Sequence, residues 1–326
     1  MQEKYIFEAK NIVKKYAAHT ALDDVSIAVP EQSIFGLLGP NGAGKTSLIR
    51  IINQITAPDS GTVWLNGERL ERKHISDIGY LPEERGLYKK MKIGEQCIYL
   101  ARLKGMSKKE AKVELMKWFK KFEIDQWWNK KVEELSKGMA QKIQFITTVM
   151  HRPKLLILDE PFSGFDPINT NLVKSEILKL REEGATILLS THNMNSVEEI
   201  CDEIALLNNS KKILEGKVTQ VKERYSSNQF TIDFKGNVVA FANAVWGGWE
   251  LIHREQIGEH MFSATIKLAD SLSLNAYLTQ LLPHIEIIGV RKVSLSMNDI
   301  FIKAVEEQNE RVEGVSTNSV ESEENE

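Results

Sequence analysis

The sequence predicts an α/β fold built on a parallel sheet, and three observations support this prediction. A strand–loop–helix pattern covers residues 33–52, where a glycine-rich loop separates an apolar run from an amphipathic segment. Two further runs, residues 154–158 and 186–190, are largely apolar, and residues 171–183 between them have helical character. Apolar strands that alternate with helices are typical of a parallel sheet covered on both faces.

The glycine-rich loop is the most specific part of this pattern. Its sequence, Gly39-Pro-Asn-Gly-Ala-Gly-Lys-Thr46, fits G-x-x-x-x-G-K-[ST], whose residue types follow from holding a polyphosphate. Glycines let successive N–H groups converge on phosphate oxygens, and the N-terminus of the following helix favours an anion. We expect the Lys45 ammonium to neutralise the β- and γ-phosphates and the Thr46 hydroxyl to ligate Mg²⁺. The expected nucleotide contacts are Gly39, Pro40, Asn41, Gly42, Ala43, Gly44, Lys45, Thr46 and Ser47. The pattern predicts that the chain binds a nucleoside triphosphate; a glycine-rich turn without a ligand is the alternative.

Two acids end the apolar run at residues 154–158. Asp159 and Glu160 would therefore lie at the carboxyl edge of a buried strand, beside the phosphate loop. At that edge one acid can hold Mg²⁺ while the next orients a water molecule. The alternative is that both acids belong to a solvated loop, but the nearby phosphate loop favours the first interpretation.

Composition bounds the class of protein. The 326 residues are 42% hydrophobic and 27% charged, and no apolar run reaches the 18 residues that indicate a membrane-spanning helix. We therefore expect a soluble protein of about two domains that does not cross a membrane itself. The N-terminal residues lack the basic-then-apolar pattern of a signal peptide, so we expect a cytoplasmic location. The two cysteines, Cys97 and Cys201, fit no metal-binding spacing and are expected to be buried thiols.

Charge is unevenly distributed along the chain. The net charge is −3, yet residues 306–326 alone hold eight Glu and one Arg. Between residues 85 and 131, fourteen Lys or Arg stand against five Asp or Glu and are interleaved with apolar positions. This pattern predicts amphipathic helices with basic outer faces. Such a face is either a solvated helix surface, a contact with an anionic membrane or a contact with nucleic acid.

The remaining patterns divide the chain into three parts. Residues 1–222 are expected to form the nucleotide-binding domain, with a helical subdomain at about 85–150. Residues 228–305 show the order β-α-β-β-α-β, which predicts a small α+β domain, with the ferredoxin-like fold as its candidate. Residues 306–326 are rich in Glu, Ser and Asn, so their composition predicts a disordered acidic tail.

A family resemblance appears at Leu135-Ser-Lys-Gly-Met139, which precedes an apolar helix at residues 140–150. Taken alone, Ser136 fits a helix N-cap and Gly138 an entry turn. In their context, the residues resemble the signature loop Leu-Ser-Gly-Gly-Gln of the ATP-binding-cassette (ABC) ATPases, which lies shortly before the Asp-Glu strand. The resemblance covers about residues 4–220, and its motifs follow one another in the order of that family.

The resemblance assigns roles to further residues. Tyr16 matches the aromatic residue that stacks on adenine, although packing on a sheet is its alternative. Glu83 occupies the family's Gln-loop position, Asp166 closes the D-loop at residues 163–166, and His192 matches the switch histidine. The resemblance implies a P-loop ATPase fold with a parallel core sheet, an antiparallel β subdomain and a helical subdomain. It implies that Thr46, Glu83 and Asp159 organise Mg²⁺, and that Glu160 and His192 are catalytic.

Two departures from the family pattern concern the site. Lys137 and Met139 replace the first glycine and the glutamine of the signature loop, while Ser136 and Gly138 are retained. Glu83 stands where the family has glutamine and adds negative charge near the phosphates. ATP binding is expected to survive both departures, whereas they leave the rate of hydrolysis and its coupling open. The signature loop, the segment around Glu83 and the extra C-terminal domain resemble the NatA-like, sodium-exporter-type branch.

The implied function is ATP hydrolysis in an ABC transporter. Ser136 and Gly138 would complete the site of a second ATP-binding subunit, so a head-to-tail dimer, most simply a homodimer, is expected. Its partner would be an integral-membrane permease contacted near residues 83–103, on the inner face of the cell membrane; no nucleic-acid partner is expected. The alternatives are a soluble ABC ATPase regulator not coupled to transport and an ATP-dependent scaffold that does not hydrolyse. The transported cargo is not encoded in this chain.

Overall fold

The structure is a computed structural model that describes residues 4–323 except 18, 85, 227 and 244–246, with side chains described up to residue 310. The chain forms two compact units, one of Met1–Val218 with Phe301–Glu326 and the other of Thr219–Ile300. The first domain was expected to end at residue 222 and the second to begin at residue 228. The return of the chain to the first unit at Phe301 was not expected. Among the described residues, none of the helices combines the length and apolar character that a membrane span requires.

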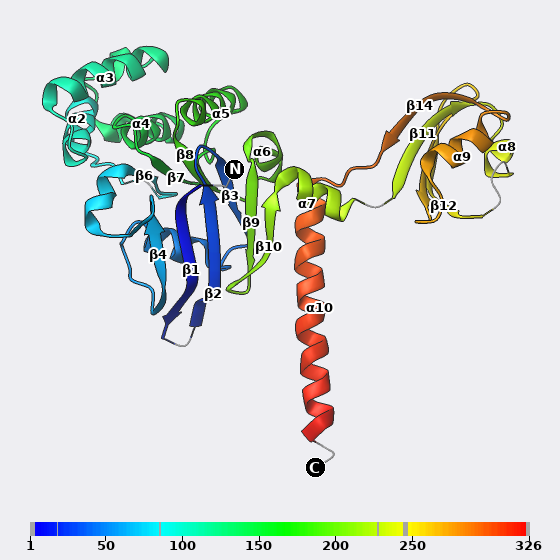
Figure 1. Ribbon diagram of the computed structural model, residues 1–326. Coiled ribbons are helices and arrows are strands. Elements are labelled where there is room, and N and C mark those ends of the chain that lie inside the picture. The colour runs from blue at the N-terminus through cyan, green and yellow to red at the C-terminus, as the bar shows by residue number, and fades with distance from the viewer. Residues whose placement is uncertain (1–3, 18, 85, 227, 244–246, 324–326) are drawn as a thin grey trace. The chain divides into compact units, whose positions relative to one another are not determined.

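A six-stranded sheet forms the centre of the first unit (Figure 1), with the strand order β10-β9-β3-β8-β7-β6. Only β10 pairs in the antiparallel sense, and the strands β3, β7 and β8 are buried throughout. The strands are β3 Ile34–Leu38, β6 Ile78–Leu81, β7 Leu155–Asp159, β8 Thr186–Ser190, β9 Glu203–Asn208 and β10 Lys211–Lys217. The helices that follow β3, β7 and β8 are α1 Lys45–Ile52, α5 Pro167–Glu182 and α6 Met194–Ile200. The parallel sheet predicted from the apolar runs is therefore confirmed.

A second, antiparallel sheet lies in the same unit, with the strand order β2-β1-β4-β5. Its strands are β1 Tyr5–Tyr16, β2 His19–Pro30, β4 Ser60–Leu65 and β5 Glu68–Arg69. Asn66 and Gly67, which join β4 to β5, both have positive φ, 51° and 77°, as a type I′ hairpin turn requires. A single apolar core that includes Phe7, Phe35 and Ile49 joins this sheet, α1 and the central sheet.

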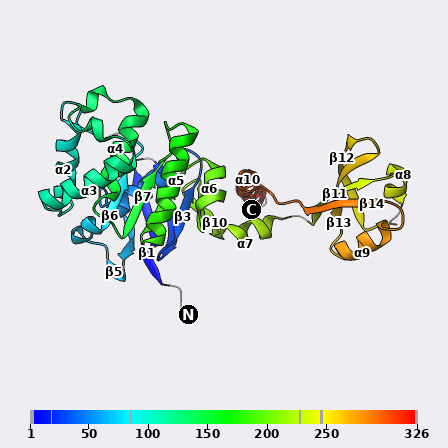
Figure 2. The same cartoon turned by 90° about the horizontal axis from the view of Figure 1, so that it is seen from above.

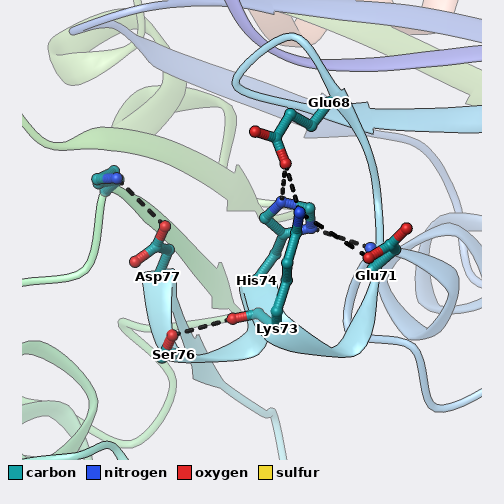
Figure 3. A network of polar contacts seen from close by, with 7 residues as sticks. Glu68, Glu71, Lys73, His74, Ser76 and Asp77 are labelled. Atoms are coloured by element: carbon teal, nitrogen blue, oxygen red, sulfur yellow. Dashed lines mark hydrogen bonds and ion pairs between the residues drawn. The ribbon is translucent and has the colours of Figure 1, made fainter.

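A polar network fixes the short helix η1, Arg72–Asp77, which leads from the antiparallel sheet into β6 (Figure 3). The Glu71 N–H donates to His74 Nδ1 at 2.9 Å, so the proton of the neutral ring is on Nε2, 3.3 Å from a Glu68 carboxylate oxygen. Lys73 donates to the same Glu68 oxygen at 2.6 Å. At the other end, Asp77 accepts from Lys154 Nζ at 3.2 Å, which ties the start of β6 to the start of β7. Because its ring contacts both Glu68 and Glu71, His74 has a structural role.

Helices α2 Ile93–Leu103, α3 Lys108–Lys121 and α4 Lys137–Val149 form the helical part of this unit, with short turns η2 Asp125–Trp127 and η3 Val132–Glu134 between α3 and α4. Figures 1 and 2 show α2 and α3 at the end of the unit that is far from β9 and β10. Their inner faces are apolar, and an aromatic cluster of Trp118, Phe122 and Phe145 joins α3 to α4. The Lys121 ammonium of α3 pairs with Glu176 of α5, a carboxylate that is only 8% exposed. The amphipathic helices predicted from the charge pattern are thus present.

The second unit is a four-stranded antiparallel sheet with helices α8 and α9, after the helix α7. Its elements are α7 Val218–Tyr225, β11 Gln229–Lys235, α8 Val238–Asn243, β12 Trp249–Gly258, β13 Met261–Leu268, α9 Leu274–Leu281 and β14 Glu286–Lys292. The order β12-β13-β11-β14 is that of a β-α-β-β-α-β fold of the ferredoxin-like type. Residues 244–246, between α8 and β12, lie outside the described residues. In the core of the second unit, Phe234 and Phe241 stack with ring centroids 4.5 Å apart.

The last helix, α10, spans Met297–Glu323. The structure therefore makes residues 306–323 a continuation of this helix, where the composition predicted a disordered tail. Glu, Gln and Arg are good helix formers, so the polar composition of this segment is also compatible with a helix. A helix face that includes Phe301, Ala304 and Gln308 is at least partly buried, which the tail's composition did not indicate.

Candidate functional site

The phosphate loop lies between β3 and α1, as expected, and packs against two other strands. Its three glycines have positive φ: Gly39 149°, Gly42 82° and Gly44 107°. A β-carbon at Gly39 would collide with the carbonyl oxygen of Leu207, and one at Gly44 with that of Ala21. Gly42 has open space around it. Two of the glycines are therefore required by close packing as well as by backbone conformation.

Lys45 is the first residue of α1 and its ammonium lies against the loop. Its Nζ donates to the carbonyl oxygens of Gly39 at 2.7 Å and Pro40 at 3.0 Å. Burial lowers the pKa of Lys45, while the negative charges of Glu160, Asp159 and Glu83 act in the opposite direction. The expected acids therefore lie within electrostatic reach of this ammonium.

Asp159 ends β7 and is almost fully buried. Burial raises its pKa, and the charges of Glu83 and Glu160 add to that effect while Lys45 opposes it. A buried carboxylate among other acids is stabilised by a cation, and Mg²⁺ typically takes one or two protein oxygens together with phosphate oxygens. No group of three or more His, Cys, Asp or Glu that could hold a metal occurs among the residues that the structure describes. Asp159 could supply one such oxygen, and the Thr46 hydroxyl another.

Glu160 and His192 lie in direct contact because β7 and β8 are parallel neighbours. The Glu160 carboxylate accepts hydrogen bonds from the Thr191 hydroxyl at 3.2 Å and the His192 N–H at 2.9 Å, and it lies 2.7 Å from His192 Nδ1. Since a carboxylate only accepts, Nδ1 donates, and Nε2 of the neutral ring is an acceptor. The Glu160 side chain is 13% exposed and that of His192 78%. Glu160 also has a φ of 48°, which is unusual for a residue other than glycine.

Glu83 follows β6 and is exposed. The segment around it is fixed by Gln144 of α4, whose Nε2 donates to the carbonyl oxygens of Pro82 and Glu84, both at 3.3 Å. Gln144 was not among the residues expected at the site. The signal was a glutamine on the apolar side of the helix expected at residues 140–150. Its buried amide links the helical part of the unit to the Glu83 segment.

The signature loop and the D-loop lie next to each other. Ser136 is the N-cap of α4 and accepts from the Met139 N–H at 3.3 Å, and Asp166 is the N-cap of α5. The aliphatic part of the Lys137 side chain packs on Gly164, whose φ is 85°. The N-cap alternative for Ser136 is therefore found in the structure, and its contact with a second molecule stays a prediction.

Tyr16 is the last residue of β1 and is 39% exposed. The Lys14 ammonium lies 5.4 Å from the centroid of its ring. Lys14 also forms an ion pair with Asp59 at 2.9 Å, which positions the ammonium. The ring is thus exposed enough to stack on a ligand, and its contact with adenine stays a prediction.

A phosphate loop and an acid-ended strand in a parallel sheet, together with an antiparallel sheet and a helical subdomain that carries the signature loop, define a nucleotide-binding domain of the ABC ATPase class. Residues 22–163 match the family model described as ABC transporter. Residues 216–305 match the model described as ATP-binding protein DrrA1-3-like, C-terminal domain.

The chain belongs to the family of ABC transporter ATP-binding proteins. It is 48% identical to YhaQ of Bacillus subtilis (strain 168), an uncharacterized ABC transporter ATP-binding protein, over 223 residues, which are 68% of this chain and 74% of YhaQ. It is 30% identical to the ABC transporter ATP-binding protein NatA of the same organism over 236 residues, 71% of this chain and 94% of NatA. A solved ATP-binding subunit of an ABC transporter superposes with a TM-score of 0.64 at 29% identity, covering 68% of this chain and 93% of that chain.

Proposed function

We propose that this protein is the ATP-hydrolysing subunit of an ABC transporter and drives a separate membrane permease. The observation that supports this most strongly is the contact between Glu160 and His192 at the edge of the sheet that carries the phosphate loop. Together they offer a carboxylate base and a polar ring beside the loop that would hold the triphosphate. Family membership supports ATP binding, and this pair is the reason to propose hydrolysis.

The reaction is the in-line attack of water on the γ-phosphate of ATP, in which positioning and charge stabilisation supply the catalysis. Lys45 and the loop N–H groups hold the diphosphate that leaves. The Glu160 carboxylate orients the attacking water and accepts its proton, and the His192 ring, which donates its Nδ1–H to Glu160, holds that carboxylate beside the γ-phosphate. Mg²⁺, held by Thr46, Asp159 and Glu83, would neutralise charge on the phosphates. Thr191 fixes the Glu160 carboxylate at 3.2 Å, so the base is oriented before the substrate binds.

A second copy of the chain completes the site in this proposal. Ser136, Gly138 and Asp166 are exposed or partly exposed at the starts of α4 and α5. In a head-to-tail homodimer these three residues would face the nucleotide that is held by the other subunit's phosphate loop. The Tyr16 ring of that other subunit would stack on the adenine of the same nucleotide. ATP then joins the two subunits, and hydrolysis releases them.

The permease is proposed to contact residues 83–103, at the inner face of the cell membrane. Three large apolar side chains there are exposed: Tyr88 by 54%, Tyr99 by 44% and Leu103 by 65%. The Tyr88 and Tyr99 rings meet edge-on with centroids 6.3 Å apart. An exposed group of this kind suits a protein contact. The resemblance to the NatA-like branch favours export as the direction.

The test is the variant Glu160→Gln with Glu182→Gln, an exposed residue of α5, as the matched control. We expect Glu160→Gln to bind ATP, to accumulate as a dimer in size-exclusion chromatography and to release almost no phosphate. Ser136→Arg should bind ATP as a monomer. Phosphate release at the wild-type rate by Glu160→Gln would contradict the assignment. Co-purification of this protein with a polytopic membrane protein tests for the permease partner. Absence of this protein from the membrane fraction would favour a regulator that is not coupled to transport.

A further inference from the structure

The phosphate loop rests against two strands that are distant in sequence. Gly39 lies on the carbonyl group of Leu207 in β9, and Gly44 lies on that of Ala21 in β2, with no room for a β-carbon at either point. A shift of either strand would therefore press on the loop or leave a gap behind it.

The turn between β9 and β10 joins these two strands. The Ser210 hydroxyl donates to the Thr20 carbonyl oxygen at 2.5 Å, and the Asp23 N–H donates to the Ser210 carbonyl oxygen at 2.8 Å. Asn209 and Ser210 have positive φ, 45° and 66°, as the two central residues of a type I′ hairpin turn require, so the turn has a specific backbone conformation. The turn thus sets the spacing between the two strands that support the loop.

Helix α10 reaches the start of this turn. Asn208, the last residue of β9, is only 4% exposed, and its Nδ2 donates to Gln308 Oε1 at 2.6 Å. Both residues belong to the first unit. Gln308 lies on the same helix face as Phe301 and the buried Ala304, and Figures 1 and 2 show α10 beside β10. The hydrogen bond is therefore shielded, and its loss would leave a buried amide group without a partner.

We propose that Gln308 is a positioning residue for the phosphate loop: α10 holds Asn208, and through the turn at residues 208–210 it holds the two strands on which the loop rests. The proposal rests on the proposed function in that ATP is the ligand of the loop. The hydrogen bond keeps the loop in the shape that accepts the phosphates. α10 begins at Met297, and its residues from Phe301 onward belong to the first unit.

The experiment compares Gln308→Ala, Gln308→Glu and the control Glu306→Ala, a substitution on the exposed side of the same helix. The dissociation constant of a fluorescent ATP analogue and the kcat and KM of ATP hydrolysis are measured for the full chain. We expect Gln308→Ala to raise the dissociation constant and KM by roughly fivefold with kcat unchanged, as the loss of one shielded hydrogen bond suggests. Gln308→Glu keeps an acceptor for Asn208 and should bind as the wild type does, and so should the control.

A double variant makes the test specific. In Asn208→Asp the Gln308 amide can turn its N–H group towards the new carboxylate, so this single variant keeps one hydrogen bond. Asn208→Asp combined with Gln308→Glu sets two carboxylates against each other and should weaken binding at least as much as Gln308→Ala. Unchanged binding in Gln308→Ala, or equal weakening in Glu306→Ala, would overturn the proposal while ATP binding by the wild type stands. A wild type that binds no ATP would overturn the proposed function itself, and this inference with it.

Discussion

The glycines of the phosphate loop allow a prediction in which backbone conformation and packing have separate effects. Gly42 and Gly44 both have positive φ, and only Gly44 is packed against another strand. An alanine in the left-handed region costs about 1–2 kcal/mol. If the free loop relaxes this strain and the nucleotide must restore it, Gly42→Ala weakens ATP binding by up to roughly 5- to 30-fold.

Gly44→Ala carries the same backbone cost and a steric one. Its β-carbon would collide with the Ala21 carbonyl group and lie 2.8 Å from the Leu22 side chain. Overpacking typically costs about 1–3 kcal/mol more. The sum is about 2–5 kcal/mol, which corresponds to a loss of affinity between about 30-fold and several thousand-fold.

The assay is titration of each variant with a fluorescent ATP analogue, with the free energy of unfolding measured in urea alongside. Gly184→Ala is the matched control, because Gly184 has a φ of 103° and no atom near its would-be β-carbon, outside the loop. It should lose stability and keep its affinity. Equal weakening of ATP binding by Gly42→Ala and Gly44→Ala, or a change of affinity in Gly184→Ala, would contradict this prediction.

Three further predictions concern groups outside the loop. Lys121→Met leaves the nearly buried Glu176 carboxylate unpaired and should lower the free energy of unfolding by about 2–3 kcal/mol in urea; adding Glu176→Leu should restore most of it. Burial lowers the pKa of His151 to about 4 from 6.5, so between these pH values the unfolded chain binds a proton that the folded chain does not. Stability should therefore fall by on the order of 1 kcal/mol per pH unit as the pH drops from 6.5 towards 4, and urea unfolding of His151→Gln should lack this contribution. Burial raises the pKa values of Cys97 and Cys201 to about 12, so a thiol reagent at pH 7.5 should label both only after unfolding; rapid labelling of the native protein would contradict this.

The sequence was sufficient for the parts of the fold that local patterns determine. The apolar runs predicted the parallel strands, and the glycine-rich sequence predicted the loop between β3 and α1, whose three glycines have positive φ in the structure. The structure of α10 could not be predicted, because composition alone favoured disorder at residues 306–326. The helix contacts Asn208 through Gln308. The two residues are 100 positions apart in the sequence, so no local sequence pattern connects them.

The candidate site shows the same limit. The acid-ended apolar run led to Glu160 and the family resemblance to His192, and the structure brings these two residues together. The pattern gave no sign of the positive φ of Glu160 or of its hydrogen bond from Thr191, because both depend on how β7 and β8 end side by side. Gln144 was missed for a similar reason: its partners are carbonyl groups, which carry no sequence signature.

The packing of Lys137 on Gly164 means that two sequence motifs behave as one mechanical part. A β-carbon at Gly138 would lie 3.3 Å from the Gly164 carbonyl oxygen, so the signature loop and the D-loop are close at a second point, and a shift of one loop is expected to move the other. In a dimer of the proposed kind, the signature loop and the D-loop of one subunit would therefore reach the partner subunit together. The subunit surface would then close in a single step, and a partial closure that engages only one motif would be unavailable to it.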